Sequence, residues 1–240
     1  MALFVDGPVS SIEDLAAQDS QLLDVASTEG IDVTQKMTLA QEELGLELEI
    51  LAPRLRQAVV VTAALKLWHA FRALEMVYTD AYNSQLNDRY AGKQKQFGEL
   101  ARWARDRATV IGVGVAADPV ARAATPQVTA TPGNLVDGTY YVTMAWVNRE
   151  GEEGASAEPA VETIAGSTLV VVPGIAPANA AGWNFYAGNT PDGMTRQNTT
   201  AIAVEQSWVQ PAPLGTGGTG PGTGQEPSYL KAVARVLQRG

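Results

Sequence analysis

His69 is the only histidine of this 240-residue chain, and the chain contains no cysteine. It lies inside a helical run, with no carboxylate three or four residues away to complete a metal site on the same helix face. We find no histidine partner for a serine nucleophile, so triad chemistry is excluded unless a lysine serves as the base. Disulfides and thiolate metal sites are excluded outright. We therefore interpret His69 as a hydrogen-bonded structural residue.

Two further patterns could carry chemistry, and both have simpler interpretations. The carboxylate pairs Glu42–Glu43 and Glu47/Glu49 lie on the polar side of an acidic helix, whereas a glycosidase needs two carboxylates across a cleft. The glycine-rich run 215–224 lacks the GK[ST] ending of a phosphate-binding loop. The sequence predicts no catalytic, cofactor-binding or metal site, no cofactor, and no enzymatic activity.

Charge is unevenly distributed along the chain. Residues 1–50 carry 11 acidic side chains and one basic, residues 51–107 carry 10 basic and 5 acidic, and the net charge is -9. Acidic and basic surfaces can therefore meet within one chain or between copies. An acidic total argues against a dedicated nucleic-acid binder. With no signal peptide and no long apolar run, we expect a soluble protein made in a cytoplasm, without a membrane partner.

The first half of the chain has helical periodicity. Ser10–Glu13 has the form of a capping box, Gly30 is a stop signal, and Asp32 is a new N-cap. Three apolar stripes follow at helical spacing. They are Met37, Ala40, Leu44, Leu48 and Leu51; then Leu67, Phe71, Leu74, Tyr78 and Ala81; then Phe97, Leu100, Ala104, Ala108 and Ile111. We predict an α-helical bundle over residues 1–120.

The composition changes near Pro126 to Thr, Val, Gly and Pro, and residues 138–148 alternate between two faces. Further strand candidates are 168–172, 183–187 and 207–209. Short strands at this spacing predict a β-sandwich over 126–210 that resembles immunoglobulin and fibronectin type III modules. The fold class is thus α+β, in two units.

The sequence of the C-terminal part predicts a flexible linker followed by a helix. Residues 211–226 are rich in Gly, Pro and Thr, which predicts a flexible linker. Pro227 suits a first helical turn, and Leu230, Val233 and Leu237 then share one face, with Tyr229 and Val236 beside it. We predict an amphipathic helix over 227–240 that needs a groove to bind in.

Three segments together resemble the head–tail connector adaptors of tailed bacteriophages. Residues 11–32 are similar to the start of such adaptors, the block from Leu67 to Tyr90 resembles their central helix and the turn after it, and Lys93 to Trp103 resembles the following helix. The similarity covers roughly residues 10–115 and is structural rather than catalytic. The β-module departs from the smallest adaptors and looks like an insertion before the tail.

The resemblance implies a structural virion protein of the phage neck, assembled in the host cytoplasm. It would form a homo-oligomeric ring, dodecameric by analogy, between the portal protein and a stopper or tail-terminator protein, with genomic DNA passing through the lumen. We assign portal binding to the C-terminal residues Tyr229, Leu230, Val233, Val236 and Leu237. We assign an inter-subunit charged face to Arg89, Lys93, Lys95, Arg102 and Arg105.

An alternative keeps the helices as an anchor and gives recognition to the β-module. Lectin sites stack sugars on exposed aromatic rings, so Trp183 and Trp208 are the candidates for a carbohydrate- or host-surface-binding site. The exposure of these two indoles distinguishes the alternatives, because two buried rings would indicate a scaffold.

Overall fold

The computed structural model describes residues 2–85, 88–211, 213–222 and 224–231. The chain forms two compact units. The helical unit comprises Gly7–Val115 together with the described residues that follow Glu226, and the β-rich unit comprises residues 2–6 and 116–226. The α+β class is confirmed. The unit boundaries differ from the predicted ones, because the first residues and residues 116–120 belong to the β-rich unit.

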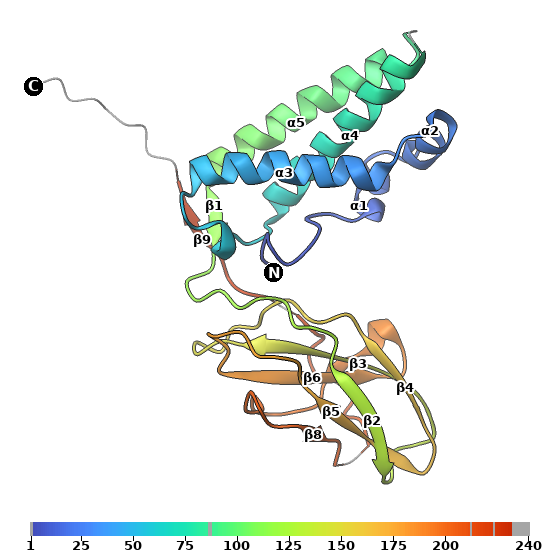
Figure 1. Ribbon diagram of the computed structural model, residues 1–240, viewed down its shortest axis with the longest axis vertical. Coiled ribbons are helices and arrows are strands. Elements are labelled where there is room, and N and C mark those ends of the chain that lie inside the picture. Colours follow the sequence, from blue (N-terminus) through green and yellow to red (C-terminus); the bar gives the residue numbers. More distant parts are fainter. Residues whose placement is uncertain (1, 86–87, 212, 223, 232–240) are drawn as a thin grey trace, which may run out of the picture. The chain divides into compact units, whose positions relative to one another are not determined.

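Five α-helices make up most of the helical unit among its described residues (Figure 1): α1 (Ile12–Gln18), α2 (Leu22–Glu29), α3 (Val33–Leu51), α4 (Ala63–Gln85) and α5 (Ala91–Ile111). A short 3-10 turn, η1 (Arg56–Ala58), follows α3. Helix α4 is central: α5 packs along it, α3 crosses it, and α1 and α2 contact it as well. Of the predicted stripe on α4, Phe71, Leu74, Tyr78 and Ala81 are buried.

The N-cap residues and the glycine stop signal noted in the sequence predict the helix ends near residues 30 and 32 correctly. Gly30 adopts the left-handed conformation after α2, with φ of 68°, and the Asp32 carboxylate accepts from Gln35 N at 3.1 Å. The capping box forms one residue later than predicted. Ser11 is the N-cap, and its backbone N–H donates to the Asp14 carboxylate at 2.8 Å. Ser10 is instead buried beside His69.

The β-rich unit contains two antiparallel sheets. One has the order β2 (Gln127–Pro132), β5 (Ser167–Val172), β8 (Trp208–Val209). The other has the order β4 (Ala160–Ile164), β3 (Gly138–Val147), β6 (Gly182–Gly188), β7 (Thr195–Arg196), with a 3-10 turn, η2 (Pro191–Gly193), before β7. Both sheets contribute to one apolar core around Trp146, Trp183 and Phe185.

The predicted C-terminal helix is wrong where the structure describes it. Ser228–Leu230 form strand β9, which pairs antiparallel with β1 (Val113–Val115) in the helical unit. Tyr229 lies opposite Gly114 and Leu230 opposite Val113. The local apolar pattern was overridden by backbone pairing with a strand far away in the sequence. The remainder of the predicted helix, residues 232–240, lies outside the described residues.

The predicted flexible linker is also corrected. In its described part, Gly215 N donates to the Gln197 side chain at 2.8 Å, and the Thr219 carbonyl accepts from Arg196 N at 3.0 Å. A Cβ on Gly218 would lie 2.8 Å from the Arg196 carbonyl oxygen, so only glycine permits this approach. Gln225 is buried, and its amide bonds Val120 N at 2.8 Å and Val120 O at 3.1 Å. The segment is therefore part of the β-rich unit.

Candidate protein-binding surface of the helical unit

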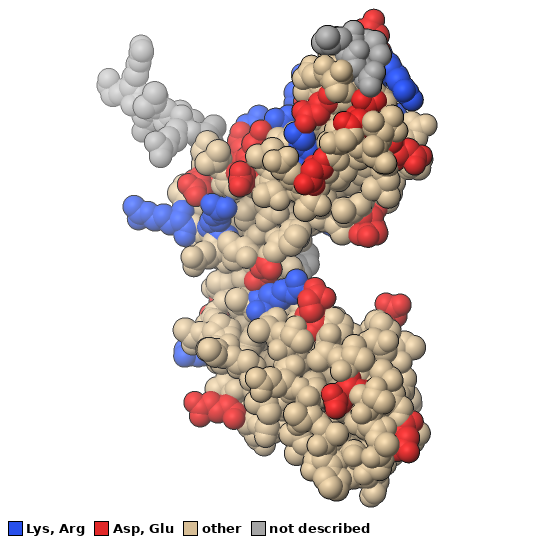
Figure 2. Space-filling view, turned by 45° about the vertical axis from the view of Figure 1, so that its right-hand side comes forward, with Lys and Arg blue, Asp and Glu red and all other residues tan. Residues whose placement is uncertain are grey.

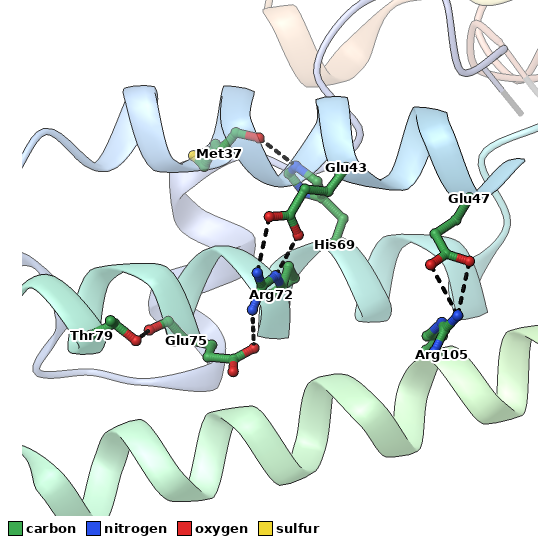
Figure 3. Close-up of polar contacts among 8 residues, drawn as sticks. All are labelled: Met37, Glu43, Glu47, His69, Arg72, Glu75, Thr79 and Arg105. Atoms are coloured by element: carbon green, nitrogen blue, oxygen red, sulfur yellow. Dashed lines mark hydrogen bonds and ion pairs between the residues drawn. The ribbon is translucent and has the colours of Figure 1, made fainter. Parts of the chain in front are cut away.

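His69 is fully buried and hydrogen-bonded through both ring nitrogens. Nε2 lies 2.9 Å from the Met37 carbonyl oxygen, to which it donates (Figure 3), and Nδ1 lies 2.5 Å from Ser10 Oγ. Burial lowers the pKa of His69, which keeps the ring neutral. The interpretation as a structural histidine is confirmed. Among the described residues, no group of three or more His, Cys, Asp or Glu side chains could hold a metal ion.

The carboxylates of α3 are joined to the basic residues of α4 and α5 (Figure 3). Arg72 donates to Glu43 at 2.7 and 3.0 Å and to Glu75 at 2.6 Å, and Arg105 donates to both oxygens of Glu47 at 2.9 Å. These bonds, above all those to Glu43, raise the pKa of Arg72. The unequal charges of the first two segments thus meet within one chain. A contact of such charges between neighbouring copies stays a prediction.

A second cluster lies where α1 ends. The Asp19 carboxylate accepts from Tyr78 OH at 2.5 Å and from Lys93 Nζ at 3.0 Å. Burial alone would raise the pKa of Asp19, but these hydrogen bonds outweigh it and hold the pKa below its usual value. A further ion pair joins Lys66 to Asp14 at 2.8 Å. On the face shown in Figure 2, the helical unit carries many charged side chains and the β-rich unit few.

Four of the five residues assigned to the inter-subunit charged face make contacts inside their own chain. Lys93 and Arg105 are in the ion pairs above, Arg102 Nε donates to Gly98 O at 3.1 Å, and the Arg89 guanidinium lies 5.1 Å from the Tyr90 ring centroid. Lys95 is exposed. The role of this face between subunits stays a prediction.

A groove of about 430 Å³ is lined by residues of α3, α4 and α5. Its apolar lining is Leu44, Leu46, Ile50, Trp68 and Ala101, and its charged lining is Glu43, Glu47, Arg72, Glu75, Arg102 and Arg105. A groove lined by both apolar and charged side chains, with most of the charges paired inside the chain, suits the binding of a protein side chain or helix.

Two helices also present large apolar side chains to solvent. On α3 these are Leu39, Leu46 and Ile50, of which Leu46 is 67% and Ile50 74% exposed. On α5 they are Trp103, Val110 and Ile111, with Trp103 47% and Val110 67% exposed. We call these sets the α3 ridge and the α5 ridge. Apolar residues gathered on one helix face indicate a protein-binding surface.

The ridges were missed by our sequence reasoning, which considered only one stripe per helix. Ile111 was placed on the core face of α5, but it is 45% exposed. The available signal was a second apolar series outside each core stripe, at positions 39, 46 and 50 and at positions 103 and 110.

The aromatic platform proposed for carbohydrate binding is not formed. Trp183 has no exposed surface, and its Nε1 donates to the carbonyls of Ala203 and Gln206 at 3.1 and 3.2 Å. Trp208 is half-buried against the core and donates to Gln210 at 3.1 Å. Trp183 therefore belongs to the core of the β-rich unit.

Of the residues assigned to portal binding, Tyr229 and Leu230 lie in β9 and are exposed. Val233, Val236 and Leu237 lie outside the described residues. Within the described part of the chain, no helix is both long and apolar enough to span a bilayer. Comparison of the chain with protein-family models, curated proteins and solved structures finds no match.

Proposed function

We propose that this protein is a non-enzymatic assembly subunit of the neck of a tailed phage. It forms an adaptor ring, dodecameric by analogy, between the portal and a stopper or tail-terminator protein, and genomic DNA passes through the lumen. The sequence resemblance over residues 10–115 suggests this role. The β-rich unit is an immunoglobulin- or fibronectin-type sandwich inserted into the helical unit, with its three- and four-stranded sheets as the supporting feature.

The observation that carries the proposal is the pair of exposed apolar ridges on the helical unit. Each exposed leucine, isoleucine or tryptophan leaves apolar area in water that burial would stabilise by about 25 cal/mol per Å². Two such ridges on one unit provide a subunit with two binding faces, which a ring requires. The charges nearby are largely neutralised inside the chain, so they do not prevent close approach.

The test is native mass spectrometry of the purified protein, alone and mixed with the portal protein encoded in the same genome. We expect monomers or weak oligomers alone and a ring of fixed mass on the portal. A variant ending at Lys231 keeps β9 but lacks the tail, so it should keep its fold and lose portal docking. A portal whose mass is unchanged by the full-length protein would contradict the proposed function.

A further inference from the structure

The α5 ridge combines the residue types that dominate protein interfaces. The Arg107 guanidinium lies 5.9 Å from the Trp103 ring centroid, and Val110 continues the exposed face one turn further. Tryptophan and arginine are the residues most enriched at binding hot spots. No ion pair joins Arg107 to another residue in the described part of the chain. Its charge is therefore available to a partner.

The α3 ridge has the same spacing and the opposite charge. Leu39 and Leu46 are seven residues apart, as are Trp103 and Val110. Glu42 lies between the two leucines and is exposed, and it too makes no ion pair with a described residue. Glu42 follows Leu39 by three positions, and Arg107 follows Trp103 by four. The ridges therefore match in spacing and in charge.

The two ridges of one chain cannot meet each other. Arg105 on α5 faces α3, because it pairs with Glu47. At about 100° per residue, Val110 lies about 140° around α5 from Arg105, on a face turned away from α3. A contact between an α5 ridge and an α3 ridge must therefore join two copies. Because the two patches differ, the contact is heterologous and closes into a ring when the rotation permits.

We propose that the α5 ridge of one copy packs on the α3 ridge of the next, with the two helices parallel. Trp103 then lies against Leu39 and Val110 against Leu46, and Arg107 pairs with Glu42. The pairing of α3 with α3 would oppose Glu42 to Glu42, and that of α5 with α5 would oppose Arg107 to Arg107, so charge favours the mixed contact. This inference rests on the proposed function and names the surfaces that build its ring.

The parallel orientation follows from two observations. Within one chain, α3 and α5 advance in the same direction, since Glu47 meets Arg105 and Leu51 lies near Gly112 at the following turns. The small rotation between neighbours in a many-membered ring preserves that direction. Relative to Leu39 and Trp103, Glu42 and Arg107 are displaced by about 60° and 40° in opposite senses. When two parallel helices face each other, residues displaced in opposite senses around their own axes lie on the same side of the contact. Glu42 and Arg107 therefore come together only in the parallel arrangement.

The contact is expected to be weak for a single pair of copies. A stable interface buries about 800 Å² per partner, whereas one tryptophan buries about 150–250 Å². Leu46 and Ile50 also line the groove beside α3, so Val110, which packs on Leu46, would lie at the edge of that groove. Association would therefore be strong only when the ring closes or when the portal aligns the copies.

Disulfide trapping tests the contact directly, because the chain has no native cysteine. A full-length chain carrying both Leu46→Cys and Val110→Cys should give covalent ladders on oxidation, at high concentration or on the portal. Each single variant should give none, and neither should the pair Leu39→Cys with Val110→Cys, which is seven residues out of register. A disulfide requires Cα atoms within about 7 Å of each other, so only the pair of cysteines that lie opposite each other in the contact can form one.

The other outcomes overturn the inference in separable ways. Dimers from a single variant would show a symmetric contact, and ladders from Leu39→Cys with Val110→Cys would show antiparallel helices. Rings seen by mass without any ladder would mean that another face builds the ring, and the proposed function would stand. No ring under any condition, portal included, would remove the proposed function itself.

A charge exchange provides the second readout. Arg107→Glu should weaken self-association, and adding Glu42→Arg should restore it. Arg149→Glu, a matched charge reversal at an exposed site of the β-rich unit, should have little effect. Trp103→Ala should weaken association about 25-fold or more, the loss typical of an interface hot spot. Failure of the double variant to recover any association would contradict the assigned pair.

Discussion

The helical unit and the β-rich unit place their paired carboxylates differently. In the helical unit, ion pairs such as Arg72–Glu43 and Arg105–Glu47 lie near the surface and connect helices, while large apolar residues remain exposed beside them. In the β-rich unit, Glu153 is buried, and its carboxylate accepts from Asn184 and from Tyr186 OH, the latter at 2.5 Å.

The same contrast extends to the main sheet. Both faces of β3 are covered, with Trp146 in the shared core and Ala145 in a smaller cluster around Tyr186 and Met194 on the other side. The main sheet is therefore covered on both faces by its own chain, and the exposed apolar side chains of this unit, such as Val136 and Ile175, lie outside β3, whereas the α3 and α5 ridges lie on the principal helices themselves. Under the proposed function, we therefore expect the helical unit to make the assembly contacts.

The largest expected effect comes from removing a core side chain in the β-rich unit. Trp183→Ala should lower its free energy of unfolding by about 3–5 kcal/mol, the usual cost of truncating a buried tryptophan. Hydrogen-exchange mass spectrometry should show faster exchange in β3 and β6 and unchanged exchange in α3–α5. Val161→Ala, at an exposed site in β4, is the control. Faster exchange in both units would mean that they do not fold independently.

Removing the C-terminal strand β9 should have a smaller effect, and it should lower the free energy of unfolding of the helical unit. Ending the chain at Glu226 removes β9, the antiparallel partner of β1, and we expect this to expose part of the buried Val113 and Val115. We expect a loss of about 2 kcal/mol, part of the burial energy of two valines. Ending it at Lys231 should leave the melting temperature within a degree or two. Equal melting curves for the two truncations would show that β9 adds nothing to the unit.

The third prediction is that the stability of the helical unit, but not that of the β-rich unit, depends on pH between 7.5 and 5. Burial depresses the pKa of His69, so the unfolded chain binds the proton more readily, and stability is lost as pH falls below about 6.5. The loss approaches about 1.4 kcal/mol per pH unit for this one group. Denaturant melts from pH 7.5 to 5 should show it in the helical unit only, because the β-rich unit has no histidine. His69→Gln should flatten the dependence; an unchanged slope would assign it to other groups.

Local signals were sufficient where the determining contact lies nearby in sequence. Gly30 and Asp32 ended and began helices as expected, and the alternating run around Tyr140–Trp146 became β3. Strand β9 was missed because Leu230 pairs with Val113, more than a hundred residues earlier. The predicted linker looked free because its partners lie outside it: Gln197 is 18 residues from Gly215, and Val120 is 105 residues from Gln225.

The candidate surface was only partly accessible to sequence reasoning. The core stripe of α3 was readable from its spacing, but which residues outside it stay exposed depends on how α3 and α5 pack on α4. The intrachain pairing of Arg105 with Glu47 likewise depends on that packing, so composition alone left the partner of each charge open.

The bond from Gln225 to Val120 has a consequence for the order of folding. Pairing Ser228 with Val115 directly from the unfolded chain would close a loop of about 110 residues, at an entropic cost of about 4 kcal/mol. Once the β-rich unit has folded, Gln225 and Val120 are already together, and the remaining loop is only about eight residues long, costing about 2 kcal/mol. Folding of the β-rich unit therefore lowers the entropic cost of pairing β9 with β1, and we expect β9 to pair last.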